Sequence, residues 1–204
     1  MANNLRLFNT NSEYQSADLI LPSVSYVIET DKVIYDYTPP TPPVFQGKWK
    51  ATYWDGRIIS AECDSTSAIT NGEVGNYGEF SLEIGDCVTS IDNYAFSNYH
   101  LTSIDIPSGV TSIGNSAFGE CTSLTSIDIP SGVTAIGDRA FNGCRNLAGI
   151  TVNATTPPLL FPLFVSRPFD ITNDCPIYVP SQSVNEYKSA ISWSYYASRI
   201  YPIP

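Results

Sequence analysis

Acidic and hydroxyl side chains recur at a regular spacing in the centre of the chain. Asp105 and Asp128 each lie between two isoleucines, and Glu83 and Thr151 occupy the equivalent positions one repeat earlier and one repeat later. In an extended strand the isoleucines face one side and the residue between them faces the other. The resulting strip of outward-facing residues comprises Glu83, Thr102, Ser103, Asp105, Thr125, Ser126, Asp128 and Thr151.

This strip has three interpretations. It is a solvated surface that protects an exposed sheet face from aggregation, a docking surface for a basic protein patch or a glycan, or a calcium site. The calcium interpretation is the weakest, because stacked carboxylates supply oxygen ligands but no enclosing loop. We predict no metal and no cofactor.

Catalytic residues are not indicated by the sequence. The chain has a single histidine, His100, so a Ser-His-Asp triad would have to form by accident. No P-loop, G-x-G-x-x-G or H-E-x-x-H motif is present. Asp105 and Asp128 would stack about 5 Å apart as like charges, whereas a glycosidase needs an acid and a nucleophile in different environments. We therefore predict that the protein is not an enzyme.

The strip belongs to an internal repeat. Leu101–Ser123 and Leu124–Asn146 are identical at 16 of 23 positions, a fainter copy covers Glu79–His100, and a broken copy follows from Leu147. Fixed-period self-similarity of this length is the signature of a solenoid, in which each repeat buries its apolar row against its neighbours. We expect a short strand ended by proline in each repeat, and one helical or 3₁₀ turn at Asn115–Phe118.

The repeats resemble the BspA-like leucine-rich repeats. The shared pattern is L-x-x-I-x-I-P-x-x-V-x-x-I-x-x-x-A-F-x-x-C, and the resemblance extends over about residues 49–204 but not over residues 1–45. It implies an α/β repeat fold, a short leucine-rich-repeat solenoid with a β-hairpin N-terminal cap and a C-terminal strand-helix cap. It also implies a bacterial surface or secreted adhesion-type protein and transfers no catalytic residues.

Five segments are expected along the chain. Residues 1–38 form a small β-rich attachment or oligomerisation module, with a strand at Leu5–Phe8, a short helix at Ser12–Asp18 and a hairpin around Thr30–Asp31. Residues 39–45 are a proline-rich, semi-rigid linker. Residues 46–78 supply the cap hairpin, 79–153 the repeat coils, and 154–204 a C-terminal loop and capping helix.

The C-terminal segment carries two predictions. Thr155–Arg167 is apolar and proline-rich, so it is either a loop packed on the last coil or an exposed insertion. The second alternative makes a partner-binding apolar patch of Leu159, Leu160, Phe161, Leu163 and Phe164. After a strand at Ile177–Pro180, a helix over about Ser183–Arg199 presents Val184, Tyr187, Ile191 and Tyr195 as its buried stripe.

Cysteine usage leaves the redox state open. The five cysteines are an odd number. Cys121 and Cys144 are equivalent in the repeat and predict a ladder of buried thiols. A disulfide between them is the less favoured alternative, and a zinc site is poorer still because no C-x-x-C or nearby histidine completes the ligands.

Composition limits the partners. A formal net charge of −10 disfavours nucleic acid, and no window is apolar enough for a membrane span. The start of the sequence has no apolar segment typical of a Sec signal peptide. The expected location is extracellular, at a cell surface or on a virion, with the cytoplasm as an open alternative.

These features predict a non-enzymatic binding or adhesion protein displayed by a bacterial surface or a phage appendage. Its ligand is a protein or a glycan, and residues 1–45 are a candidate homo-oligomer contact. The alternative is a secreted cell-surface adhesin whose signal peptide is missing from this sequence. A hydrolase within the N-terminal unit is a remote third class.

Overall fold

The computed structural model describes residues 26–29, 32–35, 46–76, 78–161 and 167–204. The chain divides into two compact units, Met1–Val44 and Phe45–Pro204. In the first unit β1 (Tyr26–Glu29) and β2 (Lys32–Tyr35) pair antiparallel, as the alternation of residues 25–37 predicts. The strand expected at Leu5–Phe8, the helix expected at Ser12–Asp18 and the proline-rich linker lie outside the described residues.

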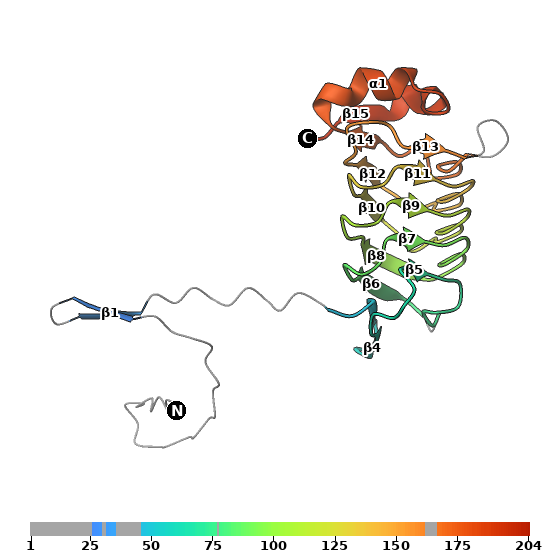
Figure 1. The fold of residues 1–204 in the computed structure, drawn as a ribbon. Coiled ribbons are helices and arrows are strands. Elements are labelled where there is room, and N and C mark those ends of the chain that lie inside the picture. Colours follow the sequence, from blue (N-terminus) through green and yellow to red (C-terminus); the bar gives the residue numbers. More distant parts are fainter. Residues whose placement is uncertain (1–25, 30–31, 36–45, 77, 162–166) are drawn as a thin grey trace. The chain divides into compact units, whose positions relative to one another are not determined.

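The second unit is a stack of coils that carries two sets of parallel strands, one of longer and one of shorter strands, which run along the stack in Figure 1. The longer strands are β6 (Phe80–Ile84), β8 (Leu101–Asp105), β10 (Ser126–Ile129), β12 (Gly149–Val152), β14 (Ile177–Val179) and β15 (Ile200–Pro202). The shorter ladder consists of β5 (Ala68–Ile69), β7 (Ser90–Ile91), β9 (Ser112–Ile113), β11 (Ala135–Ile136) and β13 (Leu159–Leu160). The solenoid expected from the repeats is therefore present.

The one helical or 3₁₀ turn expected at Asn115–Phe118 is present only as turn hydrogen bonds and not as a helix, since the N–H of Gly119 donates to the C=O of Ser116 at 3.0 Å. Residues 115–120 form successive turns, and Ser116 has a φ of 49°. The N–H of Phe118 donates to the C=O of Ala140 in the next coil, at 2.8 Å. Alternate turn amides therefore bond to the next coil, the amides between them bond within the turn, and left-handed residues interrupt the helical pattern. The described coils are built from strands and turns, without the helix that an α/β repeat implies.

A row of stacked phenylalanines forms the centre of the core. Phe96, Phe118, Phe141 and Phe169 occupy successive coils and are fully buried. Their ring centroids are 5.3, 5.1 and 5.5 Å apart, with interplanar angles of 21°, 7° and 11°. This offset stacking arises because the repeat places one aromatic ring at the same point of each coil.

The repeat-equivalent cysteines are free, buried thiols, in agreement with the predicted ladder. The Sγ atoms of Cys121 and Cys144 lie 3.0 Å from the carbonyl oxygens of Phe96 and Phe118. Burial raises the pKa of Cys121 to about 12, so the thiol stays protonated and unreactive at neutral pH. Cys175 is also free and buried.

A disulfide joins Cys63 to Cys87, which the sequence analysis does not foresee. Cys63 follows the N-terminal hairpin and Cys87 lies in the turn after β6, so the bond ties the hairpin to the first coil. These two cysteines are not equivalent positions of the repeat, so the repeat pattern carries no signal for their pairing.

The hairpin β3 (Trp49–Tyr53) and β4 (Ile58–Ala61) lies at the N-terminal end of the stack. It turns at Asp55–Gly56 as expected, and β3 pairs antiparallel with β6. Trp49, Ala51 and Tyr53 alternate with polar residues and are buried against the coils.

Lys48 anchors this end of the stack by a buried charge. Its side chain is 1% exposed, and its Nζ lies 2.8 Å from Glu73 and 3.2 Å from Asp64. It also donates to Oγ1 of Thr66 at 2.8 Å. Burial alone would lower the pKa of Lys48, but the hydrogen bonds to Glu73 and Asp64 outweigh it and raise that pKa. Lys48 is therefore held charged.

Lys48→Met should lower the free energy of unfolding by about 2 kcal/mol. This is less than the 3–5 kcal/mol typical of a broken buried pair, because Asp64 and Glu73 keep some contact with water. Urea unfolding measures the change. Lys50→Met is the matched control, since Lys50 pairs with Glu83 at the surface and should cost less than about 1 kcal/mol. Equal effects of the two variants would contradict the anchoring role.

The C-terminal end contains the strand β14, the 3₁₀ helix η1 (Ser181–Ser183), the helix α1 (Val184–Ser189), the 3₁₀ helix η2 (Trp193–Arg199) and β15. Figure 1 shows α1 over the end of the stack. The continuous helix expected over Ser183–Arg199 is wrong, because the chain leaves the helix at Ala190 and Ser192 has a φ of 69°.

This break changes which side chains are buried. Tyr187 is buried and Val184 packs on the core, as predicted, but Ile191 and Tyr195 are exposed. Trp193 and Tyr196 are buried in their place, because the break shifts the helical register of every later residue. The Nε1 atom of Trp193 donates to the C=O of Pro158 at 2.7 Å.

Candidate functional site

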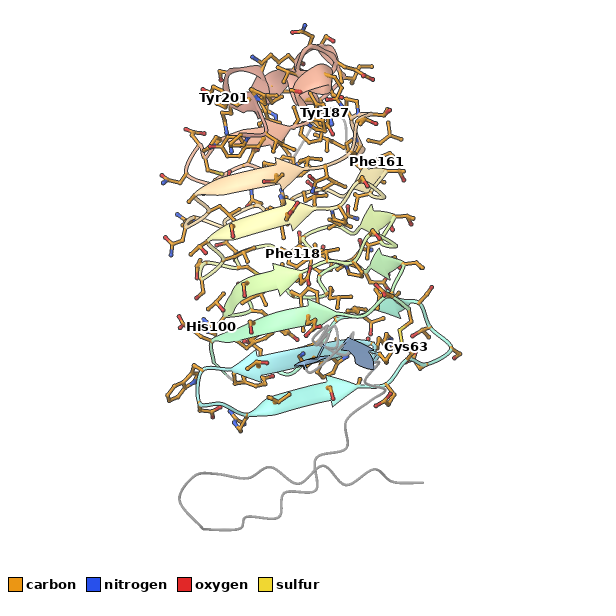
Figure 2. All side chains as sticks on the ribbon, turned by 90° about the vertical axis from the view of Figure 1, so that its left-hand side faces the viewer. Cys63, His100, Phe118, Phe161, Tyr187 and Tyr201 are labelled. Atoms are coloured by element: carbon orange, nitrogen blue, oxygen red, sulfur yellow. A yellow bond between two sulfur atoms is a disulfide. The ribbon has the colours of Figure 1, made fainter. Side chains whose placement is uncertain are left out.

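The predicted strip lies on the outward side of the longer strands, which we call the strand face and which faces the viewer in Figure 2. Within the β6–β8 ladder Glu83 pairs with Asp105, and within the β10–β12 ladder Asp128 pairs with Thr151. The strands β8 and β10 belong to different hydrogen-bonded sheets but contact each other in the stack. The structure thus brings the predicted acids into one row.

The row continues at both ends with residues that the sequence analysis missed. The antiparallel register places Lys50 beside Glu83. The parallel register places Tyr178 beside Thr151, and Tyr201 beside Tyr178. The strand face therefore has a basic residue at one end, acids in the middle and two tyrosines at the other end.

The acids of the row have different surroundings. Glu83 forms an ion pair with Lys50, and the side-chain amide of Asn153 donates to Oδ1 of Asp128. The side chain of Asp105 is exposed, and its carboxylate has no hydrogen bond or ion pair with any residue that the structure describes. The acids therefore lie in one row but have different partners, because neighbouring coils supply different residues.

The hydroxyl groups also divide into two kinds. The β6–β8 ladder has a bulge between Phe80 and Ser81, and there Oγ1 of Thr102 donates to the C=O of Phe80 at 2.9 Å. Thr102 thus contributes to the coil itself. The other hydroxyl residues of the strip are exposed, namely Ser103, Thr125 and Ser126, except Thr151, which is half-buried like Thr102. Among the acids, Asp128 is exposed like Asp105, and Glu83 is half-buried.

Two shallow depressions lie on the strand face. The first is lined by the charged residues Lys50, Glu83 and Asp105 together with Thr52, Ser81 and Ser103. The second is lined by Tyr178 and Tyr201 with Asp174, Pro176, Ser198, Arg199 and Pro202. Both are open, so they suit a large ligand surface better than an enclosed small molecule.

Tyr178 and Tyr201 provide the aromatic surface of this face. A Cβ added at Gly149 would lie 3.2 Å from the ring of Tyr178, so that ring packs across strand β12. Tyr201 is 48% exposed, and its hydroxyl donates to the C=O of Ser198 at 3.1 Å. The alternation of Ile177, Tyr178 and Val179 in the sequence already indicates that Tyr178 faces outward. Which residues lie beside it depends on how β14 pairs with β12 and β15.

The predicted apolar patch is wrong at Leu160. Leu159 and Phe161 are exposed, but Leu160 is fully buried, because β13 pairs with β11 and turns this side chain into the core. Leu163 and Phe164 lie outside the described residues. For the part of the segment that is described, the packed-loop interpretation therefore fits better than an exposed insertion.

The described residues contain neither a metal-binding cluster nor a membrane-spanning helix. Within residues 46–76, 78–161 and 167–204 no group of three or more histidine, cysteine or acidic side chains could hold a metal ion. His100 is exposed and directly precedes β8. None of the helices in the part that the structure describes is long and apolar enough to cross a membrane.

Comparison with known proteins identifies the repeat region. Residues 78–159 match the family model described as the BspA type leucine rich repeat region, in six copies. The match includes every strand from β6 to β12, and so covers longer and shorter strands of the coils. It confirms the resemblance drawn from Leu101–Asn146, and it leaves the N-terminus uncovered. No curated protein matches the chain.

Proposed function

Because residues 78–159 carry leucine-rich repeats of the BspA type, we propose that this chain is a non-enzymatic binding protein that recognises a protein ligand through its strand face. Repeat solenoids bind partners on such extended faces, because the side chains of successive coils form one continuous surface. The row that ends in Tyr178 and Tyr201 is the observation that supports this proposal most directly.

The composition of the strand face supports protein recognition. Tyrosine offers a large, rigid and amphipathic contact area, and serine adds adaptable hydrogen bonds, as in binding loops of antibodies. Asp105 is exposed and unpartnered among the described residues, so it remains available for a basic group of the ligand. The negative charge of the chain, −10, would speed association with a basic partner.

A glycan is the second candidate ligand. The exposed ring of Tyr201 offers a flat surface against which the C–H groups of a sugar ring can stack. Asp174 and Ser198, which line the depression beside Tyr201, accept hydrogen bonds from sugar hydroxyls in this scheme. This candidate relies on the tyrosine end of the face, whereas the protein candidate uses the whole row.

We also propose display outside the cell, on a bacterial surface or a phage appendage. The Cys63–Cys87 disulfide supports this location, because disulfides form and persist in oxidising compartments. In this scheme residues 1–38 attach or oligomerise the protein and residues 39–45 act as a spacer. Residues 46–78 and 154–204 cap the stack, as their burial of apolar side chains at its two ends suggests.

The binding proposal is tested on the strand face. The full chain is screened against purified extracellular proteins and a glycan array, and the strongest ligand is titrated by interferometry. We expect Tyr201→Ala to weaken binding about 30-fold, the effect of one interface hot spot. Asp105→Asn combined with Asp128→Asn should weaken a basic protein ligand about 10-fold and remove most of its salt dependence.

Asp92→Asn is the matched control, because Asp92 is an exposed acid after β7, on the other ladder. It should leave affinity unchanged. A ligand whose affinity survives all strand-face changes would show that this face is not the binding surface. Loss with Tyr201→Ala alone, on a glycan, would favour the second candidate.

A further inference from the structure

The two outer edges of the strand-face sheets are protected differently. At the C-terminal edge, β15 ends at Pro202, which lacks the N–H needed to bond another strand. The N–H of Ile203 is used by the C=O of Val179. At the N-terminal edge, β4 is the outermost strand of its sheet and has no proline and no charged residue within Ile58–Ala61.

The unprotected edge is also apolar. Ile58 is 64% exposed and Ile59 is 37% exposed, and Trp54 of the same hairpin is 75% exposed. Folded monomers usually protect edge strands with charges, proline or a bulge, because an open edge pairs with other strands. An exposed Ile-Ile edge in the same hairpin as an exposed tryptophan is therefore typical of a surface that another protein chain covers.

The backbone register shows which groups of β4 are available. The N–H of Tyr53 donates to the C=O of Arg57 at 2.9 Å where the hairpin closes. Bonded pairs alternate along an antiparallel ladder, so Ala51–Ile59 is bonded to β3. The N–H and C=O groups of Ile58 and Ser60 then face away from β3, where a further strand would bond them.

We propose that this edge binds the same edge of a second copy, so that two β4 strands pair antiparallel about a two-fold axis. If Ile58 of each copy bonds to Ser60 of the other, Ile59 of one copy lies opposite Ile59 of the other. The pairing is self-complementary, as a two-fold contact requires. It also brings Arg57, at one end of the strand, close to Glu62, just beyond the other end.

A second copy fits this edge better than an unrelated strand for two reasons. The charges at the two ends of the strand match only in the antiparallel arrangement that the two-fold axis imposes. Ile59 of one copy also meets Ile59 of the other at the centre instead of a polar neighbour. The contact is independent of the strand face, which stays open in both copies, so its failure would leave the proposed ligand binding untouched.

The test uses disulfide trapping in the full chain. Opposed residues of a non-hydrogen-bonded antiparallel pair have Cα atoms about 4.5 Å apart, within the range for a disulfide. Ile59→Cys should therefore give a covalent dimer on a non-reducing gel after mild oxidation. Ile58→Cys is the matched control, because its counterpart in the other copy is offset along the strand, and it should cross-link at least 10-fold less.

Ser60→Pro removes only the outward N–H and should raise the dimer dissociation constant at least 10-fold in sedimentation, with Ser60→Ala as the control. Thermal unfolding of both variants checks that they fold. The proposal would be overturned if the two cysteine variants cross-linked equally. It would also be overturned if the natural chain and Ser60→Pro had the same mass in sedimentation at every concentration. An assembly that persists in Ser60→Pro would point instead to another contact of the chain.

Discussion

Replacing Phe118 with alanine is expected to lower the free energy of unfolding by about 4 kcal/mol. The ring is fully buried and lies between Phe96 and Phe141, with centroids 5.3 and 5.1 Å away. Its removal leaves a cavity that coils above and below cannot fill, because their positions are fixed by the two ladders. For a domain of this size the melting temperature should fall by about 12 °C.

Tyr94→Ala is the matched control for this prediction. Tyr94 is an exposed aromatic residue of the preceding coil, in the turn that leads to Phe96. It has a positive φ, and alanine carries the same Cβ as tyrosine, so the change removes the ring and leaves the backbone strain as it was. Tyr94→Ala should cost less than about 1 kcal/mol. If Phe118→Ala were as mild as Tyr94→Ala, the phenylalanine row would not be a stabilising element of the stack.

Loss of the Cys63–Cys87 disulfide is expected to cost about 3.5 kcal/mol. The two cysteines are separated by 24 residues, and closing a loop of that length restricts the unfolded chain by about this free energy. The double variant Cys63→Ser, Cys87→Ser should therefore unfold at lower urea concentration. The N-terminal hairpin should lose hydrogen-exchange protection first, because the bond ties it to the first coil.

A reducing agent separates this effect from the loss of side-chain packing. It should destabilise the natural chain by a similar amount and leave the double variant unchanged, because Cys121, Cys144 and Cys175 are free thiols. A further loss of stability when the double variant is reduced would mean that another disulfide forms. No loss in the natural chain would mean that the Cys63–Cys87 bond does not contribute to folding.

The repeat core could be predicted because each coil uses the same positions. Phe118 and Phe141 are equivalent in the repeat, as are Cys121 and Cys144, and all four are buried. A periodic apolar row is buried only when successive coils stack in register. The residues that face outward between the inward isoleucines, such as Asp105 and Asp128, follow from the two-residue alternation of a strand.

Positions at the two ends of the stack could not be predicted in the same way. Lys50 reaches Glu83 because β3 pairs antiparallel with β6, and the repeat contains no information on that pairing. The predicted helical stripe fails at Ile191 and Tyr195, because a single left-handed residue, Ser192, interrupts the helix. Periodicity predicts a face only while the element continues.

The amino-acid sequence by itself determined the solenoid, the inward apolar row and the outward acids, because these depend on local alternation repeated at a fixed period. The tertiary structure decided which outward residues become neighbours. Tyr178 and Tyr201 join the row of Asp128 and Thr151 only through the register of β12, β14 and β15. The Cys63–Cys87 bond and the open edge of β4 likewise depend on how the N-terminal hairpin packs on the first coil, a long-range contact that has no local signal.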